Sequence, residues 1–168
     1  AEASKLMCEG ELRQIASRGD FGLDEQRYLG IISGKTAELC ACSCRLGAHY
    51  AGADEAAQEA FARFGHHLGI AFQIADDLLD VLGDEAVVGK SLGTDLVKQK
   101  TTLPVIRLLG QLAPDDRDRV IGLLSNSHHP VCGPPKPWLD PSAAIAYSRE
   151  MAAHYAGLAK AELRAIDA

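Results

Sequence analysis

Acidic side chains interrupt an otherwise apolar run in the stretch GIAFQIADDLLDVLGD, residues 69–84. At ~100° per residue on a helix, its polar side chains share a narrow strip within an arc of roughly 100°: Gln73, Asp76, Asp77, Asp80 and Asp84. Apolar residues fill most of the remaining surface, whereas a solvent-exposed helix has a broad polar face. The pattern therefore predicts a buried helix whose acidic strip, the five residues just named, faces an internal cavity or cleft.

Carboxylates gathered in such a strip need a partner. Two of them ~6 Å apart repel by about 3 kcal/mol at an effective dielectric constant of about 20, so either some take up protons or a cation lies between them. Oxygen ligands without a nearby cysteine favour Mg²⁺, which binds few carboxylates and completes its shell with water and phosphate oxygens. The alternative for a bare DDxxD is pairing with Arg or Lys from another helix. The apolar setting and the nearby lysines favour a Mg²⁺ site at Asp76, Asp77 and Asp80.

Helical periodicity recurs along the rest of the chain, with turn residues between the segments. It predicts helices over the following ranges: 2–17, 23–48, 54–82, 94–112, 113–126 and 141–166. Pro104 should kink or interrupt the fourth of these helices, and residues 127–141 form a Pro-rich loop. No segment alternates as a strand does, so the predicted fold class is all-α.

The composition agrees with this fold class and excludes some functions. Hydrophobic residues make up 47% and aromatic residues 5% of the 168 residues, a mixture that suits one helix-rich domain. The net charge of −6 argues against a nucleic-acid surface. No apolar run approaches the ~20 residues that span a bilayer, and the N-terminus lacks the apolar core of a signal peptide. We therefore predict neither nucleic-acid binding nor a transmembrane segment.

The cysteines and histidines do not form a metal motif. Cys40, Cys42 and Cys44 fall on alternate positions of one predicted helix, whereas zinc ligands usually come in closely spaced pairs. They are interpreted as small buried residues in a reducing compartment, so the predicted location is the cytoplasm. His66 shares the face of the acidic strip two turns upstream, and a single histidine there is interpreted as a packing or surface residue.

Lysines flank the acidic helix on both sides in the sequence. Lys35 and Thr36 lie upstream in SGKTAEL, and Lys90 and Lys100 lie downstream in GKSLGTDLVKQKTTLP. Lysine is a compact charge suited to phosphate oxygens, and carboxylates that collect Mg²⁺ beside such lysines are recurring parts of diphosphate sites. GIISGKT is one residue short of a P-loop and lies in a helical pattern, so we reject that interpretation.

These motifs together resemble the trans-isoprenyl diphosphate synthases, the polyprenyl synthetase family. The resemblance rests on SGKTAEL, then GIAFQIADDLLDVLGD, then GKSLGTDLVKQKTTLP, in that order and spacing. It implies an isoprenoid-synthase-type helical bundle around a central cavity. It also implies that residues 1–168 are the C-terminal part of a single polyprenyl synthetase domain, because members of the family are about twice as long.

The resemblance implies a role for each matching residue. The second aspartate-rich motif binds Mg²⁺ that bridges to the allylic diphosphate: Asp76, Asp77 and Asp80. The diphosphate is bound by three lysines: Lys35, Lys90 and Lys100. Catalysis near the reacting carbons is assigned to three residues: Lys35, Thr36 and Gln73. Gln14 is expected to face the same cavity.

The resemblance implies a prenyltransferase that condenses an allylic diphosphate with isopentenyl diphosphate by ionisation, condensation and elimination. The family's first aspartate-rich motif and the Arg pair that binds isopentenyl diphosphate are absent from this sequence. We therefore expect the isolated chain to be inactive, and to act as a homodimer or with a chain that supplies the N-terminal half. Two alternatives are a non-catalytic partner subunit of a hetero-oligomeric synthase and a terpene cyclase of related fold.

Overall fold

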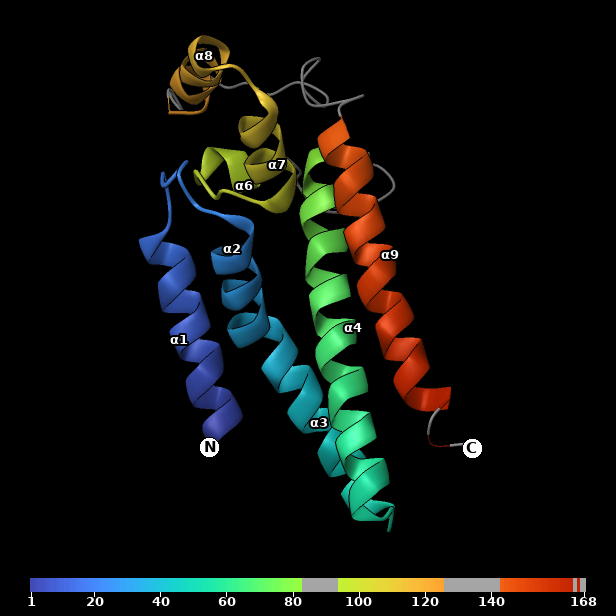
Figure 1. The fold of residues 1–168 in the computed structure, drawn as a ribbon. Helices are drawn as coiled ribbons and strands as arrows, with labels where there is room; N and C mark the ends of the chain where they lie inside the picture. Colours follow the sequence, from blue (N-terminus) through green and yellow to red (C-terminus); the bar gives the residue numbers. More distant parts are fainter. Residues whose placement is uncertain (83–93, 126–142, 165, 167–168) are drawn as a thin grey trace. The chain divides into compact units, whose positions relative to one another are not determined.

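The computed structural model describes residues 1–82, 94–125, 143–164 and 166. All regular secondary structure in these ranges is helical, which confirms the all-α prediction (Figure 1). The elements are α1 (Glu2–Ala16), α2 (Glu25–Ile32), the π-helix η1 (Ser33–Ala37), α3 (Glu38–Tyr50), α4 (Glu55–Leu82), α6 (Thr94–Val97), α7 (Leu103–Gln111), α8 (Pro114–Ser125) and α9 (Ala143–Arg164). No described helix is both long enough and apolar enough to cross a membrane.

The ends of the helices follow ordinary capping chemistry. The side chain of Asp24 accepts the backbone N–H of Arg27 at 2.8 Å at the start of α2, and Asp54 accepts that of Ala57 at 2.8 Å at the start of α4. Such side chains satisfy N–H groups that have no partner inside a helix. After α3, Gly52 adopts a φ of 82°, the left-handed conformation that often ends a helix.

Two predicted helices are divided in the structure. The helix predicted over 23–48 contains the π-helical turn η1 between α2 and α3. The helix predicted over 94–112 is interrupted as expected, because Pro104 occupies the first turn of α7, where its missing N–H costs nothing. The Pro-rich loop predicted over 127–141 lies outside the described residues.

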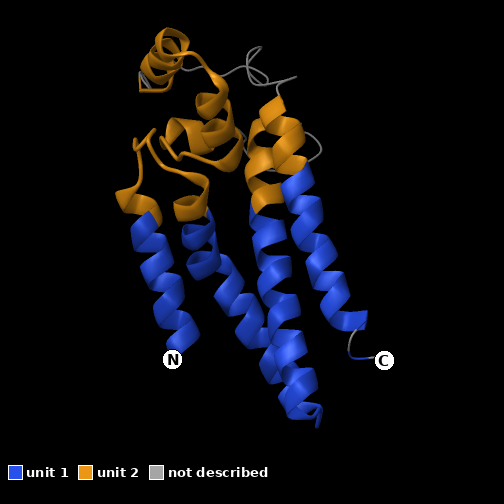
Figure 2. Ribbon diagram, in the orientation of Figure 1, with its two compact units in different colours: residues 1–13, 29–73, 150–168 blue, residues 14–28, 74–149 orange. Residues whose placement is uncertain are grey.

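The chain forms two compact units, coloured in Figure 2. Unit 1 comprises residues 1–13, 29–73 and 150–168, and unit 2 comprises residues 14–28 and 74–149. Helix α4 contributes to both units, because the boundary falls between Gln73 and Ile74.

Unit 1 contains close contacts between helix backbones at glycine positions. A Cβ atom added to Gly69 of α4 would lie 2.6 Å from the Cα of Ala37, and one added to Gly65 would lie 2.6 Å from the carbonyl oxygen of Cys40. A side chain at either position would collide with backbone that cannot turn away. These glycines therefore let α4 lie directly against η1 and α3.

Unit 2 has an apolar core of its own, built from α7 and α8. Val105 and Leu109 of α7 and Leu124 of α8 are buried together. Partly buried residues pack around them: Phe21, Leu96, Leu112, Val120 and Ile121.

Two expectations about burial need correction. Helix α4 is not buried on all of its apolar sides, because Leu68, Phe72 and Leu79 are 43%, 64% and 46% exposed. The cysteines expected in the interior, Cys40, Cys42 and Cys44, are only half-buried, and all three are free thiols. In both cases an apolar face of a helix is not covered by the described part of the chain.

Candidate active site

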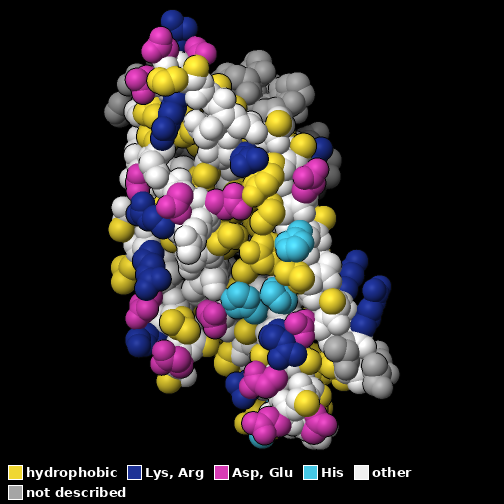
Figure 3. Space-filling view, viewed as in Figure 1, with side chains coloured by type: hydrophobic (Ala, Val, Ile, Leu, Met, Phe, Trp, Pro, Cys, Tyr) yellow, Lys and Arg dark blue, Asp and Glu magenta, His cyan; other side chains and the backbone are white. Residues whose placement is uncertain are grey.

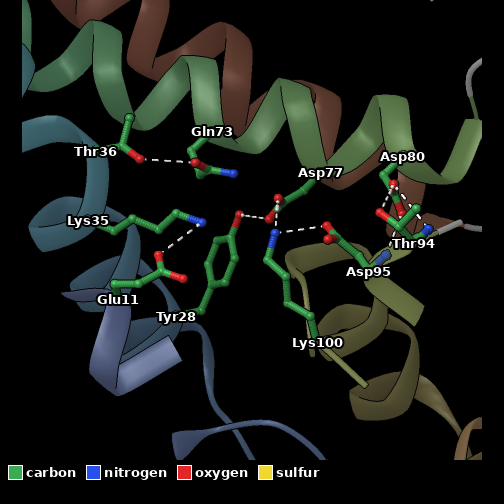
Figure 4. A network of polar contacts seen from close by, with 10 residues as sticks. All are labelled: Glu11, Tyr28, Lys35, Thr36, Gln73, Asp77, Asp80, Thr94, Asp95 and Lys100. Carbon is green, nitrogen blue, oxygen red and sulfur yellow. Dashed lines mark hydrogen bonds and ion pairs between the residues drawn. The ribbon is translucent and has the colours of Figure 1, made fainter. Parts of the chain in front are cut away.

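Asp77 lies at the centre of a buried polar cluster in unit 2. Its side chain is fully buried, and both carboxylate oxygens have strong partners (Figure 4). The Nζ atom of Lys100 lies 2.7 Å from Oδ1, and the hydroxyl of Tyr28 donates to Oδ2 at 2.7 Å. Tyr28 is itself only 2% exposed. Such complete pairing is what a buried carboxylate requires.

Lys100 joins Asp77 to a second carboxylate. Its Nζ atom also lies 2.8 Å from Oδ2 of Asp95, and its side chain is only 11% exposed. Burial alone lowers the pKa of Lys100, but the attraction of the two aspartates outweighs burial and the pKa is raised. Burial raises the pKa of Asp77, and the attraction of Lys100 only partly offsets that effect. Lys100 is thus held as a cation between two carboxylates.

Both carboxylate oxygens of Asp80 accept hydrogen bonds from the start of α6. Its Oδ1 atom accepts hydrogen bonds from the backbone N–H and the hydroxyl of Thr94, at 3.3 and 3.1 Å. Its Oδ2 atom accepts the backbone N–H of Asp95 at 3.0 Å. Asp80 therefore holds the chain so that the side chain of Asp95 reaches Lys100. We call Asp77, Asp80, Asp95 and Lys100 the aspartate–lysine cluster.

Asp76 differs from the two buried aspartates of its motif. It is half-buried, whereas Asp77 and Asp80 are 0% and 5% exposed. The described residues contain no ready-made group of three or more donors for a metal ion. Mg²⁺ needs no such group, because it binds through one or two carboxylates and keeps water or phosphate oxygens as its other ligands. The donor chemistry at Asp76 fits that mode, whereas Asp77 and Asp80 have the protein partners Lys100, Tyr28, Thr94 and Asp95.

Because Tyr28 is buried, we expect the free energy of unfolding to fall at alkaline pH. Burial, with the charge of Asp77 added to it, raises the pKa of Tyr28 well above its ordinary value. The unfolded chain therefore releases the phenol proton near pH ~10 while the folded chain keeps it, so the free energy of unfolding falls as the pH rises further. Lys100, whose pKa is also raised, acts in the same direction.

We expect Tyr28→Phe to show a shallower fall of the unfolding free energy between pH ~9 and ~11 than the unchanged chain, because one of the two groups is removed. Urea unfolding at a series of pH values measures this slope. Tyr50→Phe is the control, because Tyr50 is 84% exposed and its removal should leave the slope unchanged. Equal slopes for all three proteins would contradict the assignment to Tyr28.

A second polar group lies in unit 1, on the π-helical turn. Lys35 and Thr36 are both part of η1. The Nζ atom of Lys35 lies 3.6 Å from Oε2 of Glu11, and the hydroxyl of Thr36 donates to Oε1 of Gln73 at 3.0 Å (Figure 4). Gln73 is only 6% exposed. Single π-helical turns within α-helices occur frequently at functional sites, so the position of this pair is notable.

The structure places most of the predicted site residues in these two groups. In unit 2, Asp77 pairs with Lys100, and Asp80 is linked to Lys100 through Asp95. In unit 1, Thr36 bonds to Gln73, and Lys35 pairs with Glu11. The backbone carbonyl oxygen of Gln14 accepts a hydrogen bond from the hydroxyl of Ser17 at 3.0 Å. Lys90 and Asp84 lie outside the described residues. The pairing with lysine, raised as an alternative for the acidic strip, is thus present at Asp77.

Sequence reasoning missed three residues of these groups. Asp95 is not predicted as a site residue because it lies among lysines in a segment expected to bind phosphate. Glu11 looks like an ordinary exposed acidic residue of a helix. Tyr28 looks like an ordinary core residue of a helical pattern. A usable signal for Asp95 is its spacing of five residues from Lys100, which places an acid and a base on either side of a turn.

Comparison with known proteins supports the resemblance. The sequence profile of the family described as polyprenyl synthetase matches residues 1–131. The chain belongs to the polyprenyl synthetase family. Like other members, this polyprenyl synthetase chain has the all-α isoprenoid synthase fold.

Individual relatives agree with this assignment. A geranylgeranyl diphosphate synthase from Mycobacterium tuberculosis is 45% identical over 103 residues, which are 61% of this chain and 29% of that protein. A short chain isoprenyl diphosphate synthase from Methanothermobacter thermautotrophicus is 30% identical over 161 residues, or 96% of this chain and 50% of that protein. The crystal structure of a polyprenyl synthase from Caulobacter crescentus, complexed with calcium and isoprenyl diphosphate, has a TM-score of 0.76 at 33% identity and covers 98% of this chain and 51% of that one. The polyprenyl synthetase chain thus spans about half the length of such relatives, or less.

Proposed function

We propose that the chain supplies one wall of a prenyl diphosphate synthase site that binds an allylic diphosphate with Mg²⁺ and elongates it with isopentenyl diphosphate. The observation that carries the proposal is the aspartate–lysine cluster, in which Lys100 lies between Asp77 and Asp95 and Asp80 accepts the backbone N–H of Asp95, next to the half-buried Asp76. Bound Mg²⁺ would neutralise negative charge that develops on the departing diphosphate. Apolar side chains of α4 around the acidic strip would keep water from the allylic carbon.

The three aspartates of DDxxD have different roles in this proposal. Asp76 is the carboxylate that faces Mg²⁺, because it is half-buried whereas Asp77 and Asp80 are 0% and 5% exposed. Asp77 and Asp80 position the residues around the site. Asp77 binds Lys100 and Tyr28, and Asp80 accepts a backbone hydrogen bond from the start of α6. Lys100 balances the charge of the cluster through Asp77 and Asp95, and its predicted contact with the diphosphate stays a prediction.

Lys35, Thr36 and Gln73 serve the reacting end of the substrate in this proposal. Lys35 is paired with Glu11 at 3.6 Å, and the side chain of Glu11 is 47% exposed. The pair is only partly exposed, since the side chain of Lys35 is 25% exposed, but its Glu11 end is open to solvent, and we propose that a diphosphate replaces Glu11 as the partner of Lys35. The bond from Thr36 to Gln73 fixes the orientation of both side chains near the reacting carbons.

We further propose that another segment or chain supplies the opposite wall. Leu68, Phe72 and Leu79 form an exposed apolar stripe on α4, at helical spacing and beside the acidic strip. On the face shown in Figure 3, hydrophobic side chains reach the surface between charged ones. Since relatives are about twice as long as this chain, a second half of the synthase fold is the natural cover. It would carry the first aspartate-rich motif and the Arg pair that this sequence lacks.

The separate role of Asp76 gives a direct test. We expect Asp76→Asn to weaken Mg²⁺-dependent binding of inorganic diphosphate by about tenfold or more, because a charged oxygen ligand is lost. The free energy of unfolding should change by less than about 0.5 kcal/mol, as for an ordinary partly exposed position. Isothermal titration calorimetry with and without Mg²⁺ measures binding, and urea unfolding measures stability.

The control is Asp118→Asn, which removes an exposed carboxylate of α8 and should leave both quantities unchanged. If Asp76→Asn binds Mg²⁺ and diphosphate as the unchanged chain does, the assignment of Asp76 fails. Absence of any Mg²⁺-dependent binding by the unchanged chain would count against the proposed site as a whole.

A further inference from the structure

His66 makes contacts that the proposed function does not use. It belongs to α4 and lies on the face of Gln73, two turns upstream. Its Nε2 atom lies 3.0 Å from the hydroxyl oxygen of Ser33 and 3.4 Å from Oε1 of Glu38. Ser33 is the first residue of η1, and Glu38 is the residue directly after it. One imidazole nitrogen therefore contacts the side chains at both ends of the π-helical turn.

Those two residues are also joined through the backbone. The N–H of Glu38 donates to the carbonyl oxygen of Ser33, which is the hydrogen bond that makes this turn a π-helix. Ser33 and Glu38 are thus linked twice. The π-type hydrogen bond joins their backbones, and the His66 side chain contacts both of their side chains. Lys35 and Thr36 lie between them.

The geometry specifies the state of the imidazole. An Nε2–H group can donate to both oxygens, whereas the other neutral form would turn a lone pair toward the carboxylate of Glu38. The arrangement is not that of a Ser–His–acid triad, because there the serine and the acid contact different ring nitrogens. Here both contact Nε2, so His66 is a bridge and does not activate Ser33.

Two other ionisable side chains near His66 belong to the same helix, His67 and Arg63. The ring of His67 meets that of His66 edge-on, with centroids 5.8 Å apart, and burial lowers the pKa of His67. Arg63, one turn upstream, is paired with Glu162 of α9 at 2.8 Å. Among the described residues, Glu38 is therefore the acid that His66 contacts directly.

The remaining sides of the π-helical turn are also held. On one side Gly34 packs against Gly10 of α1, where a Cβ on Gly34 would lie 3.4 Å from the Cα of Gly10. On the other side Thr36 bonds to Gln73 of α4. A π-helical turn is uncommon and less regular than an α-helical one, so it persists where the surroundings fix it. His66 supplies the contact that reaches both of its ends.

We propose that His66 is a positioning residue, which clamps Ser33 to Glu38 and thereby fixes Lys35 and Thr36 for the diphosphate. The clamp itself rests on the contacts above, and its link to the diphosphate rests on the proposed function. The side chain of His66 is 30% exposed, so we expect substitution there to leave the core of unit 1 intact.

The test uses two substitutions that differ in reach. Gln places a polar nitrogen where Nε2 lies, whereas Asn is too short. We expect His66→Asn to raise amide hydrogen exchange over residues 33–38 by about tenfold, the effect of losing a hydrogen bond to a charged group. His66→Gln should stay within about threefold of the unchanged chain, because the bond is kept. His154→Asn, at an exposed histidine of α9, is the control and should change nothing.

Binding of inorganic diphosphate with Mg²⁺ is measured on the same proteins, and it should weaken in His66→Asn and recover in His66→Gln. Unchanged exchange in His66→Asn, or equal loss in the Asn and Gln variants, would overturn the clamp. Faster exchange with unaltered diphosphate binding would overturn its link to Lys35 and Thr36. If the unchanged chain binds no diphosphate, the proposed function fails, and the exchange data still decide the clamp.

Discussion

Replacing Asp77 by Ala should lower the free energy of unfolding by about 3–5 kcal/mol, the usual result of removing one partner of a buried charge pair. The substitution leaves Lys100 with a single carboxylate in a site where the lysine is only 11% exposed. It also leaves the buried hydroxyl of Tyr28 without its acceptor, which costs about 1–3 kcal/mol in such sites. Urea unfolding followed by circular dichroism measures the change.

A double substitution separates the orphaned charge from the lost packing. Asp77→Leu combined with Lys100→Met removes both charges, and it should be more stable than Asp77→Ala, because no unpaired cation is left in the interior. A loss below about 1 kcal/mol for Asp77→Ala, the value of a solvent-exposed pair, would show that Asp77 is not buried with Lys100. In that case the division of roles within DDxxD would have to be abandoned.

The second large effect is expected at Gly10 of α1. A Cβ atom there would lie 2.3 Å from the backbone nitrogen of Lys35 and 2.8 Å from the carbonyl carbon of Gly34. Backbone atoms cannot rotate away, so Gly10→Ala must push α1 off the π-helical turn. We expect a loss of about 2–3 kcal/mol in the free energy of unfolding, at the upper end for an overpacked site.

The matched control is Gly157→Ala in α9. A Cβ at Gly157 meets nothing within 4 Å, so the substitution should stabilise the chain by up to about 1 kcal/mol through helix propensity alone. Thermal unfolding of both variants gives the comparison. Equal effects of the two substitutions would mean that α1 does not lie against Lys35 as described.

The helices could be predicted from the sequence because each buries one face, and burial leaves a period of 3.6 residues. The ranges predicted for α1 and α4 agree with the structure to within one residue. The π-helical turn could not be predicted in this way. It arises from a shift of one backbone hydrogen bond, from Glu38 to Ser33, and backbone hydrogen bonds leave no trace in side-chain periodicity.

The site was predictable in its residue types and less so in their roles. Three aspartates on one helix face predict a shared acidic site, whereas in the structure Asp77 and Asp80 contact different partners. Which of them is buried depends on a rotation of about 100° per position and on partners from distant segments. Tyr28 reaches Asp77 across 49 positions, and Lys100 does so across 23. No local pattern encodes such pairings.

Asp80 also closes a loop in the chain. Its hydrogen bonds reach Thr94, 14 positions along the chain, and Asp95, 15 positions along, without a covalent cross-link. Because no covalent cross-link is involved, the position of Asp95, and with it the pairing of Asp95 with Lys100, depends on the carboxylate of Asp80.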